Sequence, residues 1–149
     1  MPILNYRTTI DAGKTAAEIQ VKLARAKAQA ILTEYDGQGV IVAMSFRIPT
    51  RHGLLSFRLP ANTEGVYEAL RRDPKVPPRL RTKDQAARVA WRVLKDWIEA
   101  QLALIEAQLA EAAEVFLAYA QFEDGRTVYE TLEGGGFKAL ALTGPKGGG

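Results

Sequence analysis

The sequence contains no cysteine and only one histidine, His52. The absence of cysteine excludes disulfide bonds, thiolate zinc sites and cysteine nucleophiles, and a single histidine excludes a histidine-rich metal centre. We therefore predict neither a metal nor another cofactor. A chain without disulfide bonds is typical of the cytoplasm, which is where we expect this protein.

The sequence also lacks an apolar run long enough to span a bilayer, and it does not open with the pattern of a secretory signal. Its most apolar stretch is interrupted by Arg88, Arg92, Lys95, Asp96 and Glu99. With 149 residues, 47% apolar and 25% charged, the chain has the composition of a soluble globular protein. We expect one domain, or a small domain with an appendage.

Between Thr82 and Tyr119 the chain has neither glycine nor proline, and its apolar residues recur at intervals of three and four. This pattern predicts one long amphipathic helix, and Thr82 with Gln85 has the spacing of a capping box at its start. The apolar stripe consists of Ala87, Ala90, Trp91, Leu94, Ile98, Leu102, Ile105, Leu109, Ala112 and Phe116. Thirty helical residues would extend about 45 Å, more than one small core needs. We therefore expect a homo-oligomer that associates through this helix.

The residues before the long helix predict a helix, three antiparallel strands and a second helix, so the fold class is α+β with a small antiparallel sheet. The expected strands cover residues 31–35, 40–48 and 54–59, after a first strand over 3–10 and a helix from Thr15 to about residue 28. Alternation in the last two strands predicts one core face and one face that carries arginines. Asn62 or Thr63 is expected to cap the second helix, which reaches Arg72.

We divide the chain into four parts. Residues 1–72 form the α+β core, and residues 73–81 form a basic, proline-rich connector in which three prolines prevent a helix. Residues 82–120 form the long helix, and residues 121–149 form a turn, a short helix and a frayed tail. Thr127 and Glu130 have capping-box spacing, which favours the short helix, whereas Asp124-Gly125 leaves a hairpin as the alternative.

No motif in the sequence predicts a catalytic site. Gly13-Lys14-Thr15 is similar to the end of a phosphate-binding loop, but Thr8 stands where that loop needs a glycine. We interpret Gly13 as a turn residue and Thr15 as a helix cap. His52 lies in a predicted hairpin turn, where a surface histidine is the usual finding.

A metal-dependent nuclease is an alternative that rests on carboxylates. Glu34 and Asp36 flank a predicted turn and would need Glu64 or Glu68 to complete a divalent metal site. Acidic residues beside tight turns are usually solvated, so we do not favour this alternative.

Charge is distributed very unevenly along the chain. Between Arg71 and Lys95 nine basic residues face two aspartates, a net charge of +7, and between Glu99 and Glu133 eight acidic residues face one arginine, a net charge of −7. The basic segment predicts contacts with a phosphate backbone, which arginines of the sheet would extend. The predicted nucleic-acid-binding residues are Arg71, Arg72, Lys75, Arg79, Arg81, Lys83, Arg88, Arg92, Arg47 and Arg58.

Two other interpretations of this segment stay open. Trp91, Trp97, Tyr67 or Tyr35 would be stacking platforms for unpaired bases, but Trp91 lies on the apolar stripe and Trp97 on its border, which favours packing of both tryptophans in the core. The cations of the long helix would alternatively balance its own Asp84, Asp96 and Glu99 on a solvated face.

The predicted order of elements resembles two nucleic-acid-binding folds. It is similar to the double-stranded-RNA-binding domain, but that family has a lysine cluster where this chain has Ala61-Asn62-Thr63-Glu64-Gly65. Over residues 14–72 it is also similar in topology to the core of single-strand annealing proteins, which form rings or filaments. Neither resemblance transfers a binding motif.

Several short stretches spread over most of the chain resemble a family of small uncharacterised phage and prophage proteins. They are Tyr6-Arg7-Thr8-Thr9, Thr33-Glu34-Tyr35-Asp36, Val89-Ala90-Trp91-Arg92, Lys95-Asp96-Trp97-Ile98-Glu99-Ala100-Gln101 and Asp124-Gly125-Arg126-Thr127. The resemblance implies a viral setting in the host cytoplasm, in DNA replication or recombination, and assigns no residue roles.

From the sequence we thus expect a non-enzymatic nucleic-acid-binding protein, with single-stranded DNA as the favoured ligand. The alternative is an oligomeric interaction factor, a phage accessory or host-modulating protein, that does not bind nucleic acid.

Overall fold

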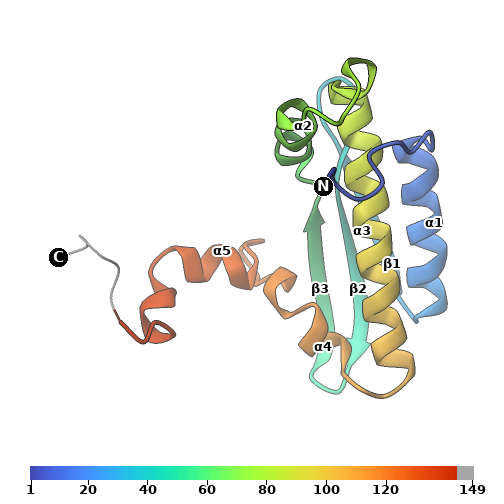
Figure 1. Cartoon of the computed structure of the whole chain (residues 1–149). Coiled ribbons are helices and arrows are strands. Elements are labelled where there is room, and N and C mark those ends of the chain that lie inside the picture. The colour runs from blue at the N-terminus through green and yellow to red at the C-terminus, as the bar shows by residue number, and fades with distance from the viewer. Residues whose placement is uncertain (144–149) are drawn as a thin grey trace.

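The computed structural model describes residues 1–143 and has the predicted α+β fold (Figure 1). The main elements are α1 (Ala12–Arg25), β1 (Ala30–Tyr35), β2 (Ile41–Thr50), β3 (Gly53–Pro60), α2 (Thr63–Arg72), α3 (Lys83–Glu106), α4 (Ala112–Val115) and α5 (Val128–Glu133). Three short 3-10 helices are η1 (Pro78–Leu80), η2 (Leu117–Tyr119) and η3 (Gly136–Ala139). Among residues 1–143, no helix is both long and apolar enough to cross a membrane.

The three strands form an antiparallel sheet in the order β1-β2-β3, which confirms the predicted meander. The register places Phe46 of β2 opposite Ile31 of β1 and Phe57 of β3. Since neighbouring residues of a strand point to opposite faces, these three side chains share the core face. Arg47 and Ser56, the next pair along β2 and β3, lie on the other face, as the alternation predicts.

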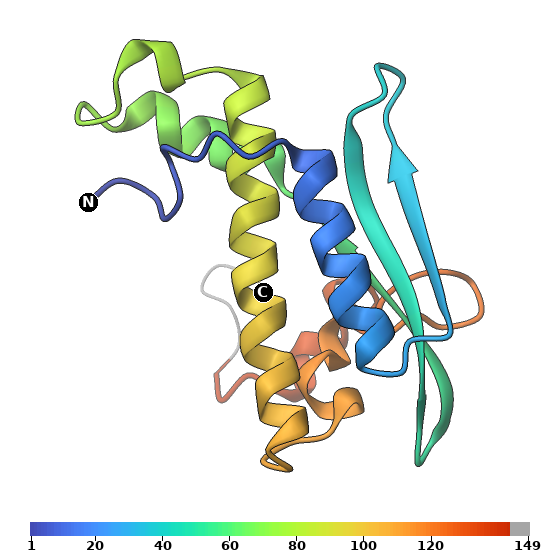
Figure 2. The ribbon, with the colours of Figure 1, turned by 90° about the vertical axis from the view of Figure 1, so that its right-hand side faces the viewer.

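Helices α1 and α3 cover the core face, and no helix of residues 1–143 covers the outer face of the sheet (Figure 2). Trp91 of α3 is buried, and its indole N–H donates to the carbonyl of Ile41 at 3.1 Å. Trp97 packs edge-on against Phe116, with ring centroids 5.6 Å apart. Both tryptophans are packing residues, which confirms the favoured interpretation.

A second, smaller cluster closes one end of the molecule. Leu70 of α2, Val76 of the connector and Ala86 of α3 are fully buried there, and Tyr6 and Tyr67 pack around them. The Asn62 side chain accepts from the N–H of Gly65, which confirms the cap of α2. Thus the connector is fixed by a buried valine, and it joins α2 to a helix that packs on the same sheet.

The N-terminal segment corrects two predictions. Residues 3–10 form turns and no strand, because the side-chain amide of Gln85 donates to the carbonyls of Tyr6 and Thr8 and holds the segment against α3. Helix α1 begins at Ala12, three residues before the predicted cap. Thr15 is fully buried inside the helix and caps nothing, because its N–H already donates to the carbonyl of Asp11.

The long helix is also shorter than predicted. It ends at Glu106, because Gln108 adopts a left-handed conformation with φ of 60° and Leu109 donates its N–H to the carbonyl of Leu104. The chain then turns back, so Phe116 reaches the core while Leu109 stays 74% exposed. The predicted apolar stripe is therefore confirmed within α3, whereas the prediction that Leu109 belongs to it is wrong.

The apolar stripe of α3 is used within the chain: Trp91 and Ile98 are buried in the core shared with α1 and the sheet. Association of two copies through this helix stays a prediction.

The C-terminal part contains both the short helix and the hairpin turn that the sequence left as alternatives. The side chains of Thr127 and Glu130 form the capping box of α5, which confirms the short helix. Before it, Gln121 pairs with Thr127 across the Asp124-Gly125 turn, as in a hairpin. The predicted frayed end falls partly on residues 144–149, which lie outside the described residues.

Candidate nucleic-acid interface

The structure distributes the ten predicted nucleic-acid-binding residues over three places. Five exposed cations surround the end of α2, the connector and the start of α3, and we call this group the basic end. The basic end consists of Arg71, Arg72, Lys75, Arg79 and Lys83. Arg81 lies inside the same region, Arg88 and Arg92 lie between α1 and α3, and Arg47 and Arg58 lie on the outer sheet face.

The basic end stands on a rigid base, because its cations flank the buried Leu70 and Val76 of the second cluster. The side chain of Arg71 is 55% exposed and that of Lys83 is 75% exposed. Within residues 1–143, Arg72, Lys75 and Arg79 take part in no ion pair, but Arg72 donates to the carbonyl of Glu68 at 3.2 Å. The side chains of Lys75 and Arg79 are therefore the freest to meet an anion.

Two cations of the basic end form ion pairs with exposed carboxylates. Arg71 pairs with Glu68 at 2.7 Å, and this hydrogen bond raises the pKa of Arg71 and lowers the pKa of Glu68. Lys83 lies 3.9 Å from Glu64. Both pairs are exposed, so they are worth little and phosphate oxygens can replace the carboxylates.

Arg81 supports the basic end from within. Its guanidinium donates to the carbonyl of Asp73 at 3.1 Å, and its Nε is buried with no hydrogen-bond partner among the described residues. The contact joins the start of the connector to its end. Arg81 therefore holds the connector in shape and is not presented to solvent as Arg79 is.

Arg88 and Arg92 join α3 to α1. Arg92 donates to Glu18 at 2.8 Å, and its side chain is only 16% exposed. Arg88 lies 3.5 Å from Asp11. The structure thus pairs these two arginines with carboxylates of α1, whereas the sequence offered acidic residues of the same helix as their partners.

A third ion-pair group at this seam centres on Glu99, which contacts Lys95 of the same helix and Lys22 of α1. Hydrogen bonds from Lys95 and then Lys22 lower the pKa of Glu99. A carboxylate whose pKa is lower in the folded state stabilises that state at pH values above its unfolded pKa of about 4.3. This stabilisation is lost as the pH falls through the folded pKa.

We therefore expect Glu99→Gln to lower the free energy of unfolding at pH 7 by up to about 1 kcal/mol, since the group is partly exposed. The difference from the natural chain should shrink as the pH falls below about 4. Urea unfolding at pH 7 and pH 3 measures it. An equal difference at both pH values would show that the ion pairs contribute nothing.

Arg47 and Arg58 lie on the side of the sheet that faces away from the helices, whereas α2 and the connector lie on the helix side (Figure 2). Arg58 donates two hydrogen bonds to Glu34, at 2.8 and 3.3 Å, and the first of these raises the pKa of Arg58. Arg47 is exposed. The structure therefore does not bring these two arginines together with the basic end.

The residues of the nuclease alternative have other partners. Glu34 is held by Arg58, and the carboxylate of Asp36 accepts from the N–H groups of Gln38 and Val40 in its own turn. In the part of the chain that the structure describes, no three such residues are grouped so that they would hold a metal ion. His52 is exposed in the β2–β3 turn, as predicted.

Sequence reasoning missed the contribution of the N-terminal segment to this region. Tyr6 packs in the second cluster, and the guanidinium of Arg7 lies 5.2 Å from the centre of its ring. The amine of Lys83 lies in the same way 5.9 Å from the ring of Tyr67. No local signal places residue 6 beside residue 67, because the link runs through the side chain of Gln85.

No family model matches this chain, and no curated protein or solved structure matches it either. The resemblance to phage and prophage proteins therefore stays a prediction, and the assignment of function rests on the geometry of the chain.

Proposed function

We propose that this protein binds nucleic acid, with single-stranded DNA as its main ligand, through the basic end. The observation that carries the proposal is a group of five exposed cations on a rigid base, of which Lys75 and Arg79 form no ion pair within residues 1–143. Cations of this kind bind a phosphate backbone by displacing its counterions and need no sequence-specific contact.

A single strand is favoured because tyrosines lie beside the cations. Tyr6 and Tyr67 belong to the second cluster, and each has a cation over its ring. Unpaired bases stack on such rings at about 1–3 kcal/mol each, whereas bases inside a duplex are not accessible to them. The buried Trp91 and the packed Trp97 supply no such platform.

The proposal gives the chain no catalytic step. Replication or recombination as the setting, phage origin and a place in the host cytoplasm are part of the same proposal and rest on the resemblance and the composition alone.

Fluorescence anisotropy with a labelled single-stranded oligonucleotide tests the proposal. We expect binding at low salt that weakens as salt is added, and weaker binding to a duplex of the same length. A chain that leaves the anisotropy unchanged at low salt does not have this function.

One observation favours the second candidate, an interaction factor. Residues 128–143 project from the body (Figure 1). The side chains of Tyr129, Phe137 and Leu140 in this segment are exposed to solvent. An exposed apolar group of this kind is typical of a surface that another protein covers.

A further inference from the structure

We propose that the C-terminal arm, residues 122–143, docks on the outer face of the sheet of a second copy of this chain. This inference is independent of the proposed function, because no cation of the basic end lies on the arm or on that face. It concerns two surfaces that the fold leaves uncovered, one on each side of the contact.

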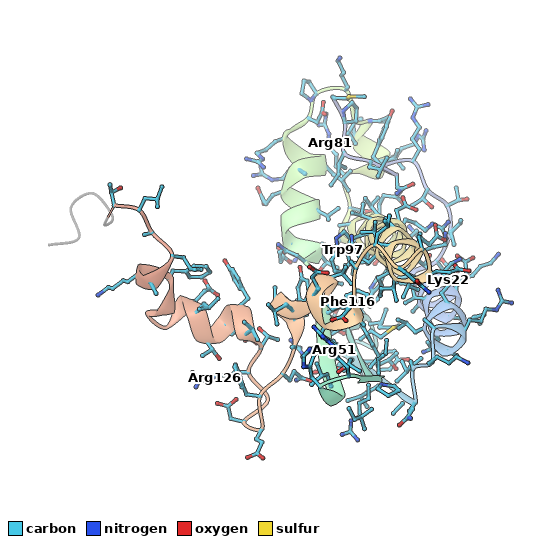
Figure 3. The ribbon with its side chains drawn as sticks, turned by 90° about the horizontal axis from the view of Figure 1, so that it is seen from below. Lys22, Arg51, Arg81, Trp97, Phe116 and Arg126 are labelled. Atoms are coloured by element: carbon cyan, nitrogen blue, oxygen red, sulfur yellow. The ribbon has the colours of Figure 1, made fainter. Side chains whose placement is uncertain are left out.

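Beyond its root, where Thr127 is buried and Val128 donates its N–H to the carbonyl of Ala120, the arm leaves the body. Figure 3 shows it leaving the body, with Arg126 at its root, on the side opposite α1. Tyr129 and Phe137 pack edge-on against each other with centroids 5.7 Å apart, yet they remain 49% and 40% exposed. Leu140 is 66% exposed. Residues 122–143 contribute no side chain to either hydrophobic cluster.

The outer face of the sheet is the second uncovered surface. Leu32 of β1 is 62% exposed and Leu54 of β3 is 52% exposed, although both belong to strands. Leu32 lines a hollow of about 570 Å³ together with the small side chains of Ser45 and Ser56, and Leu54 lies outside this hollow on the same face. A hollow with small residues at its centre and an exposed leucine suits an apolar segment.

Charge favours the arm of another copy as the occupant. The arm has four carboxylates and two cations, which is a net charge of −2. The hollow has Arg47 and Arg58 against Glu34, which is a net charge of +1. Arg47 takes part in no ion pair of residues 1–143, so a carboxylate of the arm would be its first partner.

The root of the arm is fixed at the rim of the sheet of its own chain, and it directs α5 outward. The N–H of Gln121 donates to Ser56 at 2.8 Å, and its side-chain amide donates to the carbonyl of Gly125 at 2.9 Å. The capping box of Thr127 and Glu130 then fixes the direction of α5. Folding the arm back onto its own sheet would break these contacts, whereas docking on a second copy keeps them.

The same root makes the exchange reciprocal. Gln121 and Gly125 line the hollow, so the arm starts at the rim of the face that receives the partner's arm. A twofold axis that places one arm on the partner's sheet therefore places the partner's arm on the first sheet, and the dimer is closed.

Sedimentation equilibrium of the full chain tests the dimer. We expect Leu32→Gln to raise the dimer dissociation constant about tenfold or more, because a buried leucine is lost from each of two symmetric contacts. Leu109→Gln is the matched control, since Leu109 is also exposed, at 74%, and does not line the hollow. A natural chain that stays monomeric at a concentration of about 10⁻⁴ M would overturn the proposal. Equal dimer dissociation constants for the two variants would overturn it as well.

Disulfide formation between introduced cysteines locates the contact. The sequence contains no natural cysteine, so only the introduced thiols can react. We expect Leu32→Cys and Leu140→Cys, mixed as separate chains, to form a mixed disulfide, and Leu109→Cys with Leu140→Cys to form much less. A disulfide that forms only within one chain carrying both Leu32→Cys and Leu140→Cys would mean that the arm docks on its own sheet and would overturn the proposal. Equal yields with both partners would overturn it as well.

Discussion

Replacing Phe116 with alanine is expected to lower the free energy of unfolding by about 3–5 kcal/mol. Phe116 is fully buried, and its ring packs against those of Phe46, Phe57 and Trp97 at centroid distances of 5.3, 5.6 and 5.6 Å. The substitution leaves a cavity between the sheet and α3 that none of these rigid rings can fill. Since a small domain is stable by only about 5–15 kcal/mol, much of the stability would be lost.

The next residue provides the control for this prediction. Leu117 is 54% exposed, so Leu117→Ala should change the free energy of unfolding by about 0.5 kcal/mol at most. Urea unfolding followed by tryptophan fluorescence compares the two variants. Equal effects would mean that the segment after Glu106 does not fold back onto the core.

The largest expected effect on function comes from Lys75 and Arg79, the two cations of the basic end whose side chains form neither an ion pair nor a hydrogen bond within residues 1–143. We expect the double variant Lys75→Ala, Arg79→Ala to bind single-stranded DNA at least about tenfold more weakly at low salt. The slope of log affinity against log salt should become less negative by about 1.4, because two phosphate contacts are lost. Both side chains are exposed, so the variant should fold as the natural chain does.

Net charge is controlled by a double variant of the same composition. Lys14→Ala with Arg25→Ala also removes one lysine and one arginine, and both residues are exposed on α1 and do not belong to the basic end. It should bind DNA within about threefold of the natural chain, because long-range charge alone is largely screened at 0.1 M salt. Equal losses in the two variants would assign binding to overall charge and not to the basic end.

Local signals predicted the sheet and several helix ends. Phe46 and Ile48 of β2, like Phe57 and Leu59 of β3, recur at every second position, so the shared face of Phe46 and Phe57 follows from the period. Asn62 and Thr82 cap their helices by accepting from N–H groups three residues later, a relation that lies within one turn. These features need no information from distant parts of the chain.

The end of α3 was not predictable in the same way. Its final turn uses Gln108 in the left-handed region, where glycine or asparagine is the usual signal. The segment after it continues the helical period as far as Phe116, although the chain has reversed. The return of Phe116 to the core decides this geometry, and tertiary packing overrides a good local pattern.

Sequence identified every cation of the basic end but not which cations would be free. Arg88 and Arg92 cannot be told from Arg79 by sequence, yet they form ion pairs with Asp11, which precedes α1, and with Glu18 of α1. Such pairs cannot be read from helical spacing, because they join residues more than seventy positions apart. The proposed site is therefore smaller than the run of basic residues from which it was predicted.

The salt dependence of single-stranded DNA binding tests the central claim most directly. Five phosphate contacts predict a slope of about −3.5 for log affinity against log salt, whereas all ten predicted cations would give about −7. A slope near −3.5, measured by anisotropy of the natural chain, agrees with binding through the basic end. No binding at low salt, or a slope that does not change in the Lys75→Ala, Arg79→Ala variant, would contradict it.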